Sequence, residues 1–144
     1  MSNKHASSLL AVARIEIRFN ECDPLGIVWH GNYVNYFQEG REAFGKKYHL
    51  DYMEMYNKGF ATPIVHLSTD FKRTLQYKDI ALVETTMRIT PAAKLIFDYI
   101  IRNEKNGELV CKGTTTQVFV SGKAMELSMV VPEVFADWKK LNGL

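Results

Sequence analysis

The spacing of the apolar residues changes from a period of two to a helical period and back again along the 144 residues of this chain. An alternating segment at 13–19 comes first, and a helical pattern follows at 31–48, with Tyr33 and Phe37 on one face. Four more alternating segments then run through residues 62–74, 80–90, 93–102 and 108–120, which predicts a meander of four strands. One long helix and one antiparallel sheet can bury their apolar faces against each other. The order therefore predicts a two-layer α+β fold that occupies the whole chain as one domain.

The remaining segments are shorter. A second helix is expected at 51–57, a hairpin turn with an Asn-Gly pair at 103–107, and a last helix opened by Pro132. The apolar side of that last helix should hold Val134, Phe135, Trp138 and Leu141. Gly40 lies within the apolar stripe of the long helix, which predicts that the sheet backbone comes close there.

Composition excludes several classes of protein. A net charge of +2 without a run of Lys and Arg argues against nucleic-acid binding. The two cysteines, Cys22 and Cys111, have no Cys-x-x-Cys spacing and are expected to be free thiols. The apolar run at 9–13 is too short for a signal peptide or a membrane span, so a cytoplasmic location is expected. Metal-binding and dinucleotide-binding motifs are absent from the sequence, so no cofactor is expected.

The loop between the first strand and the long helix carries the chemistry. Asp23 lies in a turn-forming Asp-Pro-Leu-Gly segment, and the helix begins a few residues later, near Gly31. The first amides of a helix, here near His30, Gly31 and Asn32, have no acceptor within the helix and lie at its positive end. A carboxylate beside such amides could attack a carbonyl group while the amides stabilise the oxyanion. Alternatively, Asp23 only shapes the turn, and His30 or Asn32 only caps the helix.

A thioester suits this arrangement better than an amide does. A carboxylate with a pKa near 3.9 is a weak base, so it needs a substrate with a good leaving group, and a thiolate is one. No Gly-x-Ser-x-Gly or His-Glu-x-x-His motif offers a serine or metal mechanism instead. The sequence therefore favours acyl chemistry on thioesters.

The segment Asp23-Pro-Leu-Gly-Ile-Val-Trp-His30-Gly-Asn-Tyr33, with Tyr36-Phe37 and Arg41 after it, resembles the signature of hotdog-fold acyl-CoA thioesterases. The similar branches are those of 4-hydroxybenzoyl-CoA thioesterase and of the YbgC-type enzymes; the His30 side chain matches the YbgC-type branch.

The resemblance implies a long central helix wrapped by a curved antiparallel sheet. It also implies that Asp23 acts as nucleophile or general base and that the amide of His30, next to Gly31, polarises the thioester carbonyl. Tyr33 and Phe37, with a neighbouring subunit, would line the acyl pocket. Basic residues would hold the phosphates of coenzyme A; the candidates are Lys72, Arg73 and Lys123.

The family also implies a homo-oligomer, either a dimer or a tetramer built from dimers. The long segment at 108–120 suggests the same, because an open sheet edge needs a cover. Three alternatives remain open at this point. The acyl donor could be an acyl carrier protein or an aryl-CoA such as a naphthoyl-CoA. The protein could be a hotdog dehydratase or hydratase, although the His-Phe-Pro loop typical of those enzymes is absent, or it could bind acyl groups without turnover.

Overall fold

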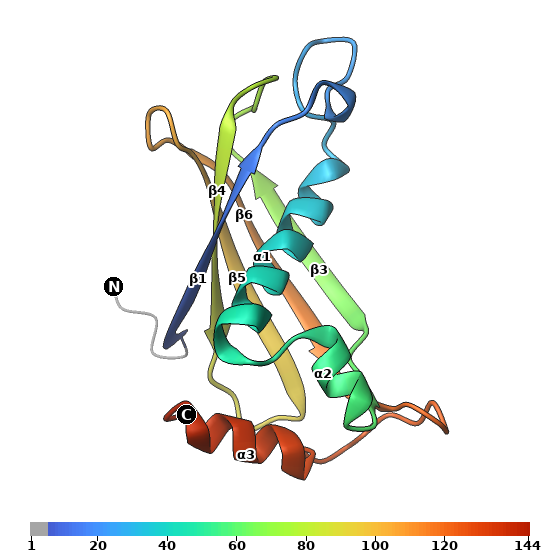
Figure 1. Cartoon of the computed structure of the whole chain (residues 1–144). Coiled ribbons are helices and arrows are strands. Elements are labelled where there is room, and N and C mark those ends of the chain that lie inside the picture. Colours follow the sequence, from blue (N-terminus) through green and yellow to red (C-terminus); the bar gives the residue numbers. More distant parts are fainter. Residues whose placement is uncertain (1–5) are drawn as a thin grey trace.

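The structure, a computed structural model, describes residues 6–144 and shows one long helix held against a curved antiparallel sheet (Figure 1). The strands are β1 (Ala6–Glu16), β2 (Phe60–Ala61), β3 (Ile64–Phe71), β4 (Ile80–Arg88), β5 (Lys94–Asn103), β6 (Leu109–Val118) and β7 (Val120–Ser121). The helices are α1 (Asn32–Tyr48), α2 (Tyr52–Asn57) and α3 (Glu133–Leu141), with a 3-10 turn, η1 (Phe19–Glu21). The predicted α+β architecture is confirmed, and no helix among residues 6–144 is long and apolar enough to cross a membrane.

The strand order in the five-stranded sheet is β1-β4-β5-β6-β3. The sequence order suggested a meander of four strands, but only β4, β5 and β6 are connected in this way. β3 instead pairs with β6, through partners such as Leu67 with Thr115. The connection from β3 to β4, residues 72–79, therefore crosses one end of the sheet. Local alternation identifies strands, but pairing depends on where the connections run, and this explains the error.

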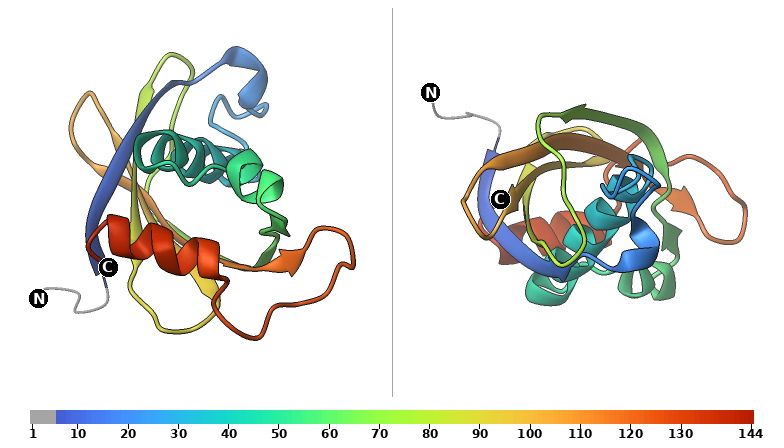
Figure 2. Two further views of the ribbon diagram at one scale, coloured as in Figure 1. Left: turned by 60° about the horizontal axis from the view of Figure 1, so that its bottom comes forward. Right: turned by 90° about the horizontal axis from the view of Figure 1, so that it is seen from above.

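α1 lies in the hollow of the curved sheet (Figure 2) and packs its aromatic face against it. Phe37 stacks on Tyr99 with the ring centroids 4.5 Å apart, and Phe44 meets Phe97 edge-on at 5.1 Å. Both phenylalanines are completely buried. These contacts fix the position of α1 against β5, so the beginning of the helix is held at a defined place at one end of the sheet (Figure 1).

Gly40 lies where α1 packs tightly against β4. A Cβ atom there would lie 2.3 Å from Thr85 Oγ1 and 2.9 Å from Val83 Cγ1. The sequence predicted that the sheet backbone would come close here. The crowding comes instead from these two side chains.

We expect Gly40→Ala to lower the free energy of unfolding by about 2 kcal/mol, because overpacking this buried contact outweighs the helix propensity gained with Ala. Urea denaturation of the variant measures the change. Gln38→Ala on the exposed side of the same helix is the control and should shift the free energy by less than about 0.5 kcal/mol. A Gly40→Ala protein as stable as the parent would contradict the packing argument.

The far end of the sheet is closed by the small elements. β2 pairs with β7, and the Trp138 indole N–H of α3 donates to the Tyr48 carbonyl at 2.6 Å. α3 begins after Pro132 as predicted, with Phe135 and Trp138 buried, but Leu141 is 86% exposed because the helix ends there. Phe19, expected on the buried face of the first strand, is also exposed, because β1 ends at Glu16 and Phe19 belongs to the 3-10 turn.

The two edges of the sheet differ. At the β1 edge the Tyr48 hydroxyl bonds to both the amide and the carbonyl of Leu10, and Lys47 Nζ donates to the same carbonyl at 2.7 Å. At the β3 edge, Ile64, Val65 and Phe71 expose 39–59% of their surface. Within residues 6–144, β3 pairs with β6 alone. The segment at 108–120, offered by the sequence as a reason for oligomers, contains β6 and lies inside the sheet; the open edge is β3.

Candidate active site

The loop before α1 is a small hairpin. Cys22 and Val28 form an isolated antiparallel bridge, and the Asp23 amide donates to the Ile27 carbonyl at 2.8 Å. Gly26 has φ +80°, a conformation that a side chain disfavours, and its amide donates to the Asp23 carbonyl at 2.9 Å. The Asp-Pro-Leu-Gly turn predicted from the sequence is therefore present, and it fixes the backbone of Asp23 on both sides.

The Asp23 carboxylate is partly exposed and oriented by its own turn. Its Oδ1 accepts the Leu25 amide at 2.8 Å, while Oδ2 has no hydrogen-bond partner among residues 6–144. One oxygen holds the rotamer and the other is available. This is the geometry expected of a positioned nucleophile or base, and it is also that of a simple turn residue.

Glu21 anchors the start of α1 through its backbone carbonyl. That carbonyl accepts the Trp29 amide at 3.0 Å and the Asn32 side-chain amide at 2.8 Å. The Asn32 amide proton is also engaged, since it bonds to the Trp29 carbonyl at 2.9 Å. Asn32 therefore supplies no free amide, and its side chain does not cap the helix. No sequence pattern indicates this role for Glu21, because the anchoring atom is a main-chain oxygen.

The amides of His30 and Gly31 remain free. Neither donates a hydrogen bond to any group in the described chain, and both lie at the positive end of a 17-residue helix. The His30 side chain is exposed, with its ring centroid 5.1 Å from that of Trp29. The Trp29 ring also occupies the space that a Cβ of Gly31 would need, with its Cζ3 atom 2.1 Å from that position. Glycine is required here for Trp29 to lie over the helix start.

Tyr33 and Phe37 differ in their access to this end of the molecule. Tyr33 is buried against Phe71 of β3, with ring centroids 5.2 Å apart, and so places the helix start beside the Phe71 end of the open edge strand. Phe37 lies one turn deeper, in the core between Tyr99 and Gly113. Their predicted contact with an acyl group stays a prediction.

Burial raises the pKa of Tyr33 to about 12. An unfolded tyrosine loses its proton near pH 10, whereas folded Tyr33 keeps it to about pH 12. The contribution to stability is therefore complete below pH 10 and is lost as the pH rises from 10 to 12. We expect the urea midpoint to fall across this range, and to fall less steeply in Tyr33→Phe. Identical slopes for both proteins would contradict this assignment.

The connection from β3 to β4 places two of the predicted basic residues, Lys72 and Arg73, at the same end of the molecule as the Asp23 hairpin. Its residues Leu75 and Gln76 pair with the hairpin, through the Val28 amide on the Leu75 carbonyl at 2.8 Å and an Ile27–Gln76 bridge. Lys72 and Arg73 begin this connection and are exposed, and Arg73 Nε lies 3.9 Å from a Glu108 carboxylate oxygen.

The third candidate, Lys123, follows β7 at the opposite end of β3. Within one chain it is therefore not brought together with the Asp23 hairpin.

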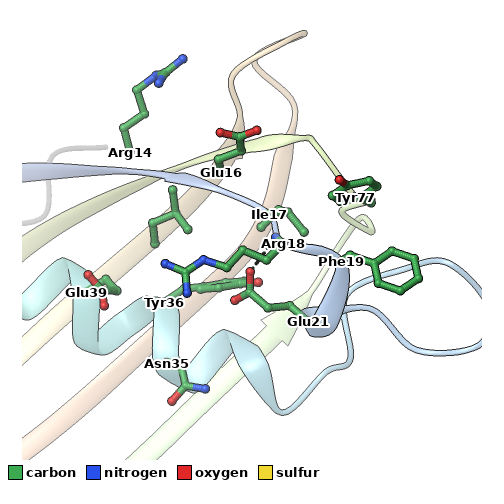
Figure 3. Close-up of a pocket in the computed structure, with 11 residues that line it drawn as sticks. Arg14, Glu16, Ile17, Arg18, Phe19, Glu21, Asn35, Tyr36, Glu39 and Tyr77 are labelled. Atoms are coloured by element: carbon green, nitrogen blue, oxygen red, sulfur yellow. Dashed lines mark hydrogen bonds between the residues drawn. The ribbon is translucent and has the colours of Figure 1, made fainter.

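A cavity of about 720 Å³ lies between β1 and the first turns of α1 (Figure 3). Arg14, Glu16, Arg18, Glu21 and Glu39 give it a mixed charge, and Arg14 forms an ion pair with Glu104 at 2.7 Å. It adjoins Glu21, but Asp23, His30 and Gly31 do not line it.

A second cavity, of about 380 Å³, lies between α1, α2 and the beginning of β3. Its walls are largely apolar and include Leu50, Met55, Leu95 and Phe97, with Arg41 and Gln117 among its polar groups. Asp23, His30 and Gly31 do not line this cavity either. No cluster of three or more metal-binding side chains occurs among the residues described.

Comparison with known proteins supplies the family. The profile of the Thioesterase-like superfamily matches residues 17–139. The chain is 32% identical over 124 residues to the proposed acyl-CoA thioesterase YneP of Bacillus subtilis (strain 168), a match that covers 86% of this chain and 88% of the relative.

Solved structures agree with this match. The DHNA-CoA thioesterase from Staphylococcus aureus superposes with a TM-score of 0.83 at 26% identity, over 93% of this chain and 89% of the other. The 4-hydroxybenzoyl-CoA thioesterase from Pseudomonas sp. strain CBS-3 superposes with a TM-score of 0.79 at 25% identity, over 93% and 99%. The predicted hotdog fold is confirmed, and the chain belongs to the Thioesterase-like superfamily.

Proposed function

We propose that this protein hydrolyses acyl-CoA thioesters to the free acid and coenzyme A. The observation that carries the proposal is one hairpin that holds a turn-fixed carboxylate, Asp23, and continues into the two free amides of His30 and Gly31. The superfamily assignment and the acyl-CoA thioesterases among the relatives support the same reaction.

The hairpin would divide the reaction between its two ends. The thioester carbonyl oxygen would accept hydrogen bonds from the amides of His30 and Gly31, and these bonds strengthen as the oxygen becomes negative. Asp23 would either attack the carbonyl carbon or take a proton from the attacking water. The carbon–sulfur bond then breaks, and the coenzyme A thiolate leaves. In the first case water hydrolyses the resulting anhydride and regenerates the carboxylate.

We propose further that two chains pair through β3. Its edge is open and exposes three apolar side chains, Ile64, Val65 and Phe71, whereas the β1 edge is blocked at Leu10 by Tyr48 and Lys47. Antiparallel pairing of β3 with its copy would join the two sheets into one and protect an edge that otherwise invites aggregation. A dimer is the smallest assembly with this property, and a tetramer of two such dimers is compatible with it. A cytoplasmic location stays a prediction.

A thiol-release assay tests the function. We expect hydrolysis of at least one thioester in a panel of short, long, branched and aromatic acyl-CoAs. Retention of acyl-CoA without release of thiol would favour the binding-module alternative, and release of an unsaturated or hydrated thioester would favour the dehydratase or hydratase. The same acyl groups on acyl carrier protein identify the donor; faster hydrolysis there would replace coenzyme A in the proposal.

A further inference from the structure

The cavity between α1, α2 and the beginning of β3 holds a buried oxygen without a partner. Gln117 is 7% exposed, and its Nε2 donates to the Thr62 carbonyl at 2.7 Å. A backbone carbonyl can only accept, so this bond fixes the orientation of the amide and leaves Oε1 as the free atom. Oε1 is buried and accepts no hydrogen bond from any described residue. Gln117 lines the cavity, so a molecule that enters the cavity with a hydrogen-bond donor can satisfy this oxygen.

Arg41 brings hydrogen-bond donors to the same cavity. Its Nη1 donates to the Tyr99 hydroxyl at 3.0 Å, and that hydroxyl lies 2.6 Å from Thr115 Oγ1. A guanidinium has five N–H donors, and none of the ion pairs recorded within residues 6–144 includes Arg41. Thr115 and Gln117 point to the same face of β6, about 7 Å apart along the strand, and Arg41 and Gln117 line the same cavity.

The charges around the cavity restrict the ligand. Glu42 and Asp51 also line it, so the walls carry two carboxylates and one guanidinium. A carboxylate group on the ligand would be repelled by Glu42 and Asp51, and it would have no proton to donate to Gln117 Oε1. A hydroxyl group satisfies both needs, because it donates to Gln117 and accepts from Arg41, and two such bonds span about 6 Å. The apolar walls at Leu50, Met55 and Leu95 suit the carbon skeleton.

The position of the cavity relates it to the reaction. It opens beside Ile64, whereas Tyr33 and the helix start lie at Phe71, the other end of β3. In a dimer paired antiparallel through β3, the Phe71 end of one chain lies beside the Ile64 end of its partner. The cavity of one chain then faces the Asp23 hairpin of the other.

We infer, on the basis of the function and the dimer proposed above, that this cavity receives the acyl group of a thioester held by the partner's hairpin. The acyl group carries a hydroxyl at its far end, and Gln117 and Arg41 recognise it. Gln117 and Arg41 are thus specificity residues. The hydroxyl can belong to an aliphatic chain or to an aromatic ring, and the experiment separates these two sources.

The test compares matched substrates with and without the hydroxyl. One pair is 6-hydroxyhexanoyl-CoA and hexanoyl-CoA, and the other is 4-hydroxybenzoyl-CoA and benzoyl-CoA. In at least one pair we expect kcat/KM to be at least about tenfold higher for the hydroxylated member, because its analogue leaves buried polar groups unpaired. Gln117→Leu and Arg41→Met should each bring the ratio of kcat/KM for the hydroxylated member to kcat/KM for its analogue close to one. The control Lys46→Met, on the exposed side of α1, should leave it unchanged.

This ratio distinguishes loss of hydroxyl recognition from damage to the fold, because a structural defect lowers kcat/KM for both members of a pair together. If Gln117→Leu fails to fold, Arg41→Met decides. Equal rates within both pairs in the parent protein, or ratios unaffected by the variants, would overturn the inference and leave the proposed function standing. Absence of hydrolysis for all four substrates, with hydrolysis of another acyl-CoA of the panel, would overturn this inference alone. Absence of hydrolysis across the whole panel would overturn the proposed function and this inference with it.

Mixed dimers test the contribution of the partner. When Asp23→Asn and Gln117→Leu chains are co-expressed with different tags, the active hairpins belong to the Gln117→Leu chain. If their acyl groups enter the cavity of the Asp23→Asn chain, the preference for the hydroxylated substrate returns. A ratio that stays near one in purified mixed dimers would place the cavity in the same chain as the hairpin and refute this geometry.

Discussion

Replacing Asp23 by Asn is expected to lower kcat by about a thousandfold and to leave KM within a few-fold of the parent value. Asn retains the oxygen that accepts the Leu25 amide, so the turn survives, but it loses the negative charge. Loss of a general base typically costs a factor of 10² to 10⁴, and loss of a nucleophile costs at least as much. Steady-state assays with the best substrate of the acyl-CoA panel measure the change.

Asp79→Asn is the matched control for this variant. The Asp79 carboxylate also accepts a backbone amide within its own turn, from Gln76 at 2.8 Å, and it lies in the neighbouring connection. It should leave kcat unchanged. His30→Ala should reduce kcat by about tenfold or less, because its backbone amide remains. Full activity of Asp23→Asn would refute the role of the carboxylate and leave it as a turn residue only.

A charge on the open edge of the sheet should separate the subunits and abolish most of the activity. Val65 is 59% exposed on β3, and Val65→Asp would place an unpaired carboxylate in the proposed dimer interface. We expect the protein to elute as a monomer in size-exclusion chromatography. Its activity should fall by more than tenfold, because each cavity would lose the hairpin opposite it.

Val12→Asp offers the same substitution on the other edge of the sheet. Val12 is 50% exposed, but its strand is protected by Tyr48 and Lys47 at the neighbouring Leu10. We expect this variant to keep the size and activity of the parent protein. A monomeric parent, or a Val65→Asp protein that stays dimeric, would exclude β3 as the interface. Monomers with full activity would show that the site is complete in one chain.

Short-range patterns predicted the parts of this protein that depend on neighbouring residues. The helical stripe of Tyr33, Phe37 and Phe44 identified α1, and the Asp-Pro-Leu-Gly turn identified the hairpin that holds Asp23. Both features arise from local backbone preferences and from one apolar face, so they can be read from consecutive residues. The resemblance in the same segment pointed to the fold family that the comparisons confirm.

Contacts between distant segments could not be predicted in this way. The pairing of β3 with β6 changed the expected order of strands, and with it the identity of the open edge. The anchoring of α1 by the Glu21 carbonyl involves no side-chain signal at Glu21. The unpaired Gln117 oxygen likewise became apparent only when Thr62, 55 residues away, was found to bind the other half of its amide.

The long helix, the long strands and the turn that holds Asp23 could be read from the sequence, because they follow from the period of the apolar residues and from one local turn motif. The identity of the open sheet edge, and of the buried polar atoms without a partner, emerged from the folded chain. Both depend on burial and pairing between residues far apart in the chain, and a pattern of consecutive residues does not show which distant segments meet.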